Sequence, residues 1–174
     1  MCKKELKKKK AYLCLLEELK VLKTLAHPNI IYLNEVINDP NKDSIFLVNE
    51  YHSNGSLGDR VKSLSEQYES KCVTEGIAVK KIGLKLKDVR LYFIDMLKAL
   101  HYCHKIVKVI HRDIKPDNIM INHNNEAVLI DFGVSALFGD QEDDTLDKNM
   151  GSYMFYAPEM FLRASDDNVK VKGE

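Results

Sequence analysis

The sequence has no tryptophan, only four prolines and four cysteines, and no apolar run long enough to cross a membrane. Its cysteines, Cys2, Cys14, Cys72 and Cys103, form no CxxC pair, which favours reduced thiols over a disulfide framework or a zinc site. The lysine-rich start lacks the apolar core of a signal peptide. We therefore expect a cytoplasmic protein, with a nuclear location possible, and no membrane partner.

No excess of one charge is present either, because 26 basic residues balance 26 acidic ones. The chain thus has no global field that would attract nucleic acid. The lysines from Lys3 to Lys10 are interpreted as the solvated start of a helix rather than as a nucleic-acid patch. With 174 residues, of which 45% are hydrophobic, the composition predicts a globular protein with one core or two small lobes. The oligomeric state stays open.

Apolar residues recur at helical spacing from Ala11 to Leu25 and predict an amphipathic helix. Its apolar stripe, within about 120° on a helical wheel, is formed by Leu15, Leu19, Leu22 and Leu25. Glu18 falls inside this stripe, whereas Glu17 falls about 100° outside it. A buried carboxylate needs a cation nearby. We therefore expect Glu18 to meet a cationic partner in the interior.

Later segments predict a mixture of strands and helices. The apolar runs Ile30–Val36 and Ile45–Val48 flank a turn-rich segment and predict an antiparallel pair. Residues 51–58 form a connector, and the polar stretch 59–87 predicts a short helix followed by a loop. A second helix is expected from Lys87 to His104, and a short hairpin from Ile119–Ile121 and Ala127–Ile130. One apolar face of that second helix is formed by Val89, Phe93, Leu97 and Leu100.

Three motifs follow in order: the run from His111 to Asn118 (HRDIKPDN), Asp131-Phe132-Gly133, and Ala157-Pro158-Glu159. Each is weak alone, but together they match the catalytic loop, metal-binding loop and activation-segment end of protein kinases. The chain, over roughly residues 12 to 162, therefore resembles the middle part of a eukaryotic serine/threonine protein kinase, or about half to two-thirds of such a domain.

The resemblance implies phosphoryl transfer from ATP to a serine or threonine of a protein substrate. Asn118 and Asp131 would bind Mg²⁺, a hard cation that prefers oxygen ligands. Asp113 would orient the acceptor hydroxyl and take its proton. Lys115 would place positive charge near the transferred phosphate and is typical of serine/threonine kinases. These four are the expected catalytic residues.

The resemblance also implies an ATP-binding cleft. Glu18 would form an ion pair with the lysine that orients ATP, which agrees with the inward position of Glu18 on the helical wheel. Backbone groups of Glu50 and His52 would bind adenine, and Met120 would lie under the ring. Asn49 departs from the family pattern, in which this position is usually apolar or threonine.

Further residues would have structural or regulatory roles. Kinases contain a column of stacked hydrophobic side chains, which here would be formed by Leu22, Leu33, His111 and Phe132. Arg112 would pair with a phosphate or an acid of the activation segment, and the acidic run from Asp140 to Asp147 or a phosphorylated Thr145 could supply that charge. Within the superfamily, Phe93 with Asp95 and the motif sequences resemble the calmodulin-dependent protein kinase kinases. Calcium regulation is not predicted, because no calmodulin-binding helix is found.

The implied fold class is α+β: an incomplete two-lobe kinase fold. Residues 1–50 would form a partial small lobe, 51–58 the hinge and connector, and 59–174 the first part of a mainly helical large lobe. Neither a glycine-rich loop nor a strand lysine precedes Ala11, so we expect a truncated copy. Alone it should be inactive and poorly soluble, with an exposed apolar helix face around Phe93 and Leu97.

Two alternatives to the kinase hypothesis follow from the same residues. A catalytically silent, kinase-like binding module is disfavoured by the intact Asp113, Asn118 and Asp131, although the missing lysine favours it. A small-molecule phosphotransferase is disfavoured by Lys115 and by the Ala157-Pro158-Glu159 motif.

Overall fold

The computed structural model describes residues 9–42, 44–75, 83–137 and 151–165. Its helices are α2 (Lys9–Thr24), α3 (Leu57–Glu75), α4 (Leu86–His101) and α5 (Pro158–Ser165). Its strands are β1 (Leu33–Asn38), β2 (Ile45–Asn49), β3 (Val109–Ile110), β4 (Ile119–Ile121), β5 (Ala127–Leu129) and β6 (Ala136–Leu137). The mixture confirms the α+β class. The lysines before residue 9, Thr145 and the acidic run lie outside the described residues.

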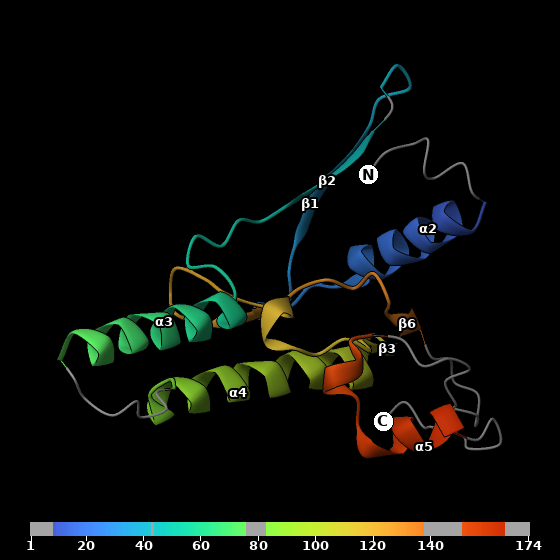
Figure 1. The fold of residues 1–174 in the computed structure, drawn as a ribbon. Helices are drawn as coiled ribbons and strands as arrows, with labels where there is room; N and C mark the ends of the chain where they lie inside the picture. Colours follow the sequence, from blue (N-terminus) through green and yellow to red (C-terminus); the bar gives the residue numbers. More distant parts are fainter. Residues whose placement is uncertain (1–8, 43, 76–82, 138–150, 166–174) are drawn as a thin grey trace.

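Helix α2 lies beside a long antiparallel ribbon formed by β1 and β2, as Figure 1 shows. Strand β1 pairs with β2 in a register that places Leu33 opposite Asn49 and Asn38 opposite Ile45. Leu15 of α2 packs against Ile45 in a small apolar cluster. The predicted strand pair is confirmed, but β1 starts later than expected, because Ile30 instead bridges to Leu129 of β5.

A larger core joins this unit to the rest of the chain. Val21 and Leu22 of α2, with Leu25 directly after it, share one buried cluster with residues of α4 and of β3 to β5. Buried Asn29 strengthens the connection, because its side-chain Nδ2 donates to the Ala127 carbonyl at 2.9 Å. Tyr102 adds a second link, since its hydroxyl accepts a hydrogen bond from the Ala26 backbone N–H at 3.1 Å. The turn after α2 is thereby fixed against β5 and the segment that follows α4.

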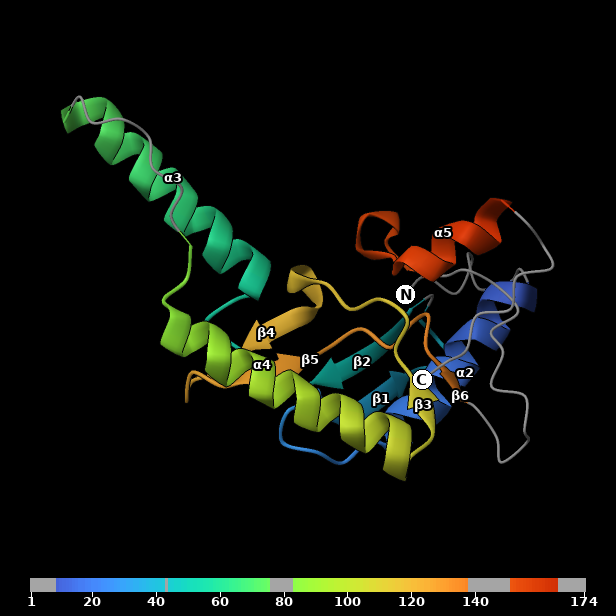
Figure 2. The same cartoon turned by 90° about the horizontal axis from the view of Figure 1, so that it is seen from below.

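Helix α4 is confirmed and continues into a π-helical turn, Tyr102–Ile106. Its buried face is formed by Tyr92, Met96 and Ala99, which pack towards β5 (Figure 2). The apolar face predicted from sequence is exposed: Phe93 is 64% and Leu97 53% accessible. This agrees with the exposed face expected for the chain alone. Among the described helices none is long and apolar enough to cross a membrane.

Helix α3 corrects the sequence prediction. The sequence predicts a short helix and then a loop within residues 59–87, but α3 starts at Leu57 and runs for 19 residues, so the connector ends at Ser56. The missed signal is a capping box. The Asp59 N–H donates to Ser56 Oγ at 3.0 Å, and Asp59 Oδ2 accepts from the Ser56 N–H at 3.2 Å and from its hydroxyl at 2.7 Å. These bonds from Ser56 lower the pKa of Asp59.

Replacing the capping hydroxyl is expected to destabilise the start of α3. Ser56→Ala should cost about 1 kcal/mol of unfolding free energy, because the first turn loses its side-chain acceptor. Urea denaturation followed by circular dichroism measures the change. Ser63→Ala, at an exposed position inside the same helix, is the matched control and should be neutral or slightly stabilising. Equal effects of the two substitutions would contradict the capping role.

Candidate active site

A two-residue strand pair, which the sequence did not predict, holds the motif loops together. Strand β3 pairs with β6, so that Val109 lies opposite Leu137 and Ile110 opposite Ala136. The HRDIKPDN run begins directly after β3, and Asp131-Phe132-Gly133 ends three residues before β6. The two motifs are therefore neighbours in space although they are far apart in the sequence.

His111 and Phe132 form the buried contact between these loops. Their rings meet edge to face with centroids 4.7 Å apart. His111 Nε2 lies 2.8 Å from the Ile130 carbonyl, and its Nδ1 accepts from the Asp113 N–H at 3.2 Å. Burial lowers the pKa of His111, which favours the neutral tautomer that these two bonds require. Leu22 shares the core cluster of Phe132 and Leu33 packs against it, so the four predicted column residues come together.

Asp113 is the centre of a hydrogen-bonded group. Its Oδ2 accepts from Lys115 Nζ at 2.7 Å and from Asn118 Nδ2 at 3.0 Å. Its Oδ1 accepts from the Ser152 N–H at 2.7 Å. Burial alone would raise the pKa of Asp113, but the bonds from Lys115 and Ser152 outweigh it and hold the pKa at about 2. Asp113 is therefore an ionised carboxylate at neutral pH.

Ser152 is the site residue that sequence reasoning missed. Its Oγ accepts from Lys115 Nζ at 2.8 Å, so it contacts both Lys115 and Asp113. The preceding Gly151 makes this approach possible, because it has φ +102° and an added Cβ would lie 2.1 Å from the Arg112 carbonyl oxygen. The available signal was the Gly-Ser pair a few residues before Ala157-Pro158-Glu159.

A cleft of about 380 Å³ holds the predicted nucleotide-binding residues, within the size range of small-molecule sites. It is lined by Glu18, Leu22, Ile31, Leu47, Asn49, Glu50, Tyr51, His52, Met120, Ile130, Asp131 and Phe132. The structure thus brings Glu18, Glu50, His52 and Met120 to one cavity together with Asp131. Asn118 and Lys115 lie beside it, in the group around Asp113.

Glu18 faces this cleft, as the helical wheel predicted, whereas Glu17 is exposed. Burial raises the pKa of Glu18, and the nearby charge of Asp131 raises it further. An added Cβ on Gly133 would lie 3.9 Å from the Glu18 carboxylate, which shows how close the metal-loop motif approaches α2. Within the described residues no lysine or arginine pairs with Glu18. Its expected cationic partner is not among them.

Arg112 binds backbone carbonyls at the start of the activation segment. Its Nε donates to the Val134 carbonyl and its Nη2 to the Ser135 carbonyl at 3.2 Å. Burial lowers the pKa of the guanidinium, and the charge of Glu17 opposes that effect. The acids and the phosphorylation site predicted to face Arg112 fall outside the described residues, so that pairing stays a prediction.

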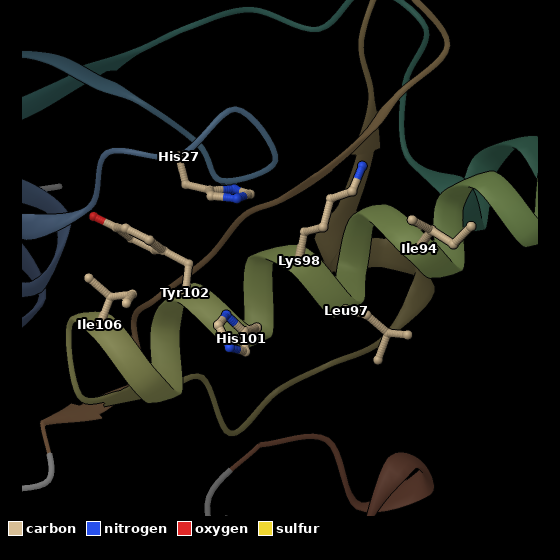
Figure 3. Close-up of a pocket in the computed structure, with 7 residues that line it drawn as sticks. All are labelled: His27, Ile94, Leu97, Lys98, His101, Tyr102 and Ile106. Atoms are coloured by element: carbon tan, nitrogen blue, oxygen red, sulfur yellow. The ribbon is translucent and has the colours of Figure 1, made fainter.

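A second pocket, of about 500 Å³, lies on the outer side of α4 (Figure 3). Tyr102 and His27 approach each other there with ring centroids 5.2 Å apart, and Ile94, Leu97 and Ile106 add apolar surface. It is larger than the cleft but contains no residue of the three motifs. The carboxylates and the lysine that suit phosphoryl transfer are all at or beside the cleft.

Comparisons with known proteins agree with this geometry. The family model described as "Protein kinase domain" matches residues 1–172. Serine/threonine-protein kinase ppk34 of Schizosaccharomyces pombe is 35% identical over 167 residues, 96% of this chain and 41% of that protein. A probable serine/threonine-protein kinase of Dictyostelium discoideum is 35% identical over 158 residues, 91% of this chain and 19% of that protein. Serine/threonine-protein kinase GRIK2 of Arabidopsis thaliana is 36% identical over 147 residues, which are 84% of this chain and 31% of that protein.

The chain spans about a fifth to two fifths of the length of these relatives. The family match nevertheless includes all three motifs and covers nearly the whole sequence. The chain therefore belongs to the protein kinase domain family.

Proposed function

We propose that this chain carries the catalytic-loop part of an ATP-dependent protein serine/threonine kinase, which transfers phosphate from Mg·ATP to a protein hydroxyl. The observation that supports it most is the group in which Asp113 accepts hydrogen bonds from Lys115, Asn118 and Ser152. The pKa of Lys115 is raised mainly by its hydrogen bond to Asp113, and the charge of Asp131, on the wall of the cleft, raises it further. A cytosolic or nuclear setting fits this activity.

Asp113 would position the acceptor hydroxyl. A carboxylate with a pKa of about 2 is a weak base, so its main contribution is a hydrogen bond that aligns the hydroxyl with the phosphorus. The proton would pass to it late, as a loose transition state for phosphoryl transfer requires. Lys115, held between Asp113 and Ser152, would stabilise negative charge that develops on the transferred group.

Asn118 and Asp131 suit a magnesium ion. Asn118 uses its Nδ2 to bind the Asp113 carbonyl and carboxylate, which leaves its Oδ1 as a ligand oxygen. Asp131 is exposed, and its Oδ1 bonds only the nearby Gly133 N–H at 3.2 Å among the described residues. An amide and a carboxylate oxygen form the hard ligand set that Mg²⁺ prefers. The ion, when bound, neutralises charge on the phosphate oxygens.

The nucleotide base would occupy the cleft between Met120 and the connector. The Glu50 N–H donates to the Tyr32 carbonyl at 3.2 Å, which fixes the backbone at that point. Within the described residues, the Glu50 carbonyl and the His52 N–H have no hydrogen-bond partner, so both are available to a base. Glu18 would hold a cation that contacts the phosphates.

A chimera tests the proposal. Residues 9–165 would replace the matching segment of the S. pombe relative, and magnesium-dependent transfer of labelled phosphate would be measured on serine, threonine and tyrosine peptides. Transfer to serine or threonine is expected. A folded chimera without transfer would favour a silent binding module, and transfer to choline or an aminoglycoside but not to peptides would favour a small-molecule phosphotransferase.

A further inference from the structure

Asn49 is a residue of the cleft to which neither the motifs nor the proposed mechanism assigns a role. It ends β2, directly before Glu50, and lines the cleft as the one carboxamide among its lining residues. The neighbouring Glu50 carboxylate already has a partner, because its Oε1 accepts from the Tyr32 N–H at 3.1 Å. Within the part of the chain that the structure describes, the Asn49 amide makes no hydrogen bond, so both its donor and its acceptor are available to a ligand.

The chemistry of adenine provides a match for this free amide. If the His52 N–H donates to N1 and the Glu50 carbonyl accepts from the 6-amino group, one edge of the base is satisfied. The second hydrogen of the 6-amino group and the N7 acceptor remain on the other edge. A carboxamide pairs with that donor and acceptor together, as asparagine does with adenine in DNA recognition.

The position of Asn49 agrees with this arrangement. Its Cα is about 3.8 Å from that of Glu50, whose carbonyl would accept from the same amino group. Around it, Leu47, Met120 and Ile130 form apolar walls of the cleft, whereas Asn49 itself is exposed. Its amide is therefore accessible to a base that enters the cleft.

We propose that Asn49 binds the 6-amino/N7 edge of the purine and makes the cleft selective for adenine nucleotides with both groups intact. The inference rests on the proposed function, because it requires the base to meet Glu50 and His52. Guanine presents two acceptors, O6 and N7, on the same edge, so the Asn49 carbonyl would face O6 without a hydrogen bond. Removal of N7 alone, as in 7-deaza-ATP, deletes one of the two bonds.

Nucleotide titration of the purified chimera described above tests the inference, with ligand-observed NMR to detect weak binding. The chimera should bind ATP about fivefold more tightly than 7-deaza-ATP, the value of one net hydrogen bond. Asn49→Leu should bind the two nucleotides equally. Asn38→Leu, the same change at an exposed position at the other end of the β-ribbon, is the matched control and should keep the preference.

Each outcome decides between the proposals. Equal binding of both nucleotides by the chimera without a substitution, or a preference that survives in Asn49→Leu, overturns the role of Asn49 and leaves the proposed function standing. Failure to bind either nucleotide overturns the proposed function and this inference with it. The comparison of the two nucleotides on the chimera itself needs no substitution at Asn49, so it holds even if the Asn49→Leu variant does not fold.

Discussion

Asp113→Asn is expected to lower the turnover of the chimera by about 10² to 10⁴, the usual contribution of a positioned acid or base. Asparagine keeps the size of the side chain but loses the charge that binds Lys115 and orients the acceptor hydroxyl. ATP affinity should stay unchanged, because Asp113 is not among the residues that line the cleft. Steady-state kinetics and a separate nucleotide titration measure the two quantities.

Asp131→Asn is expected to behave differently in the same assay. It removes a charged ligand oxygen from the cleft, so both magnesium-dependent nucleotide affinity and transfer should be lost. Asp88→Asn, at the start of α4 and away from the cleft, is the control for the chemical change. If Asp113→Asn weakened ATP binding as much as turnover, a role confined to the acceptor hydroxyl would be wrong.

The sequence predicted the position of a residue correctly where the signal lies in a single helix or a short loop. Glu18 could be placed by helical periodicity alone, because the wheel that buries Leu15 and Leu22 also turns Glu18 inward. The motif residues could be grouped by resemblance, and the structure brings Asp113, Lys115 and Asn118 into one hydrogen-bonded set. These placements can be predicted because helix geometry and short loops fix the relative positions of residues that are close in the sequence.

The features that the sequence did not predict depend on distant partners. Periodicity placed Phe93 and Leu97 on an apolar face of α4, and they are exposed as expected for the chain alone. It did not identify Tyr92 and Ala99 as buried residues of this helix. Tyr92 is suited to that position because its hydroxyl bonds Asn125 Oδ1 at 2.7 Å while its ring is buried. Ser152 was missed for a related reason. Its contacts with Asp113 and Lys115 close a loop of nearly forty residues, which no periodicity encodes.

Gly151→Ala is expected to disable catalysis in the chimera without touching a catalytic side chain. Gly151 has φ +102°, a conformation that alanine rarely adopts, and the new Cβ would lie 2.1 Å from the Arg112 carbonyl oxygen and 3.2 Å from Asp113 Oδ1. The backbone must shift to relieve the overlap. Ser152 follows directly, so the bond from its N–H to Asp113 Oδ1 should break.

Turnover should then fall by at least about tenfold, because misplacement of a catalytic group by about 1 Å is enough for such losses. ATP affinity should not change, since Gly151 does not line the cleft.

Gly83→Ala is the matched control, because an added Cβ there meets no atom within 4 Å. Unchanged turnover in Gly151→Ala would show that the segment relaxes freely and that the contact of Ser152 with Asp113 is not needed for transfer. A loss of ATP affinity as large as the loss of turnover would instead show that Gly151 supports the cleft as a whole, since a local shift around Asp113 cannot reach the nucleotide base.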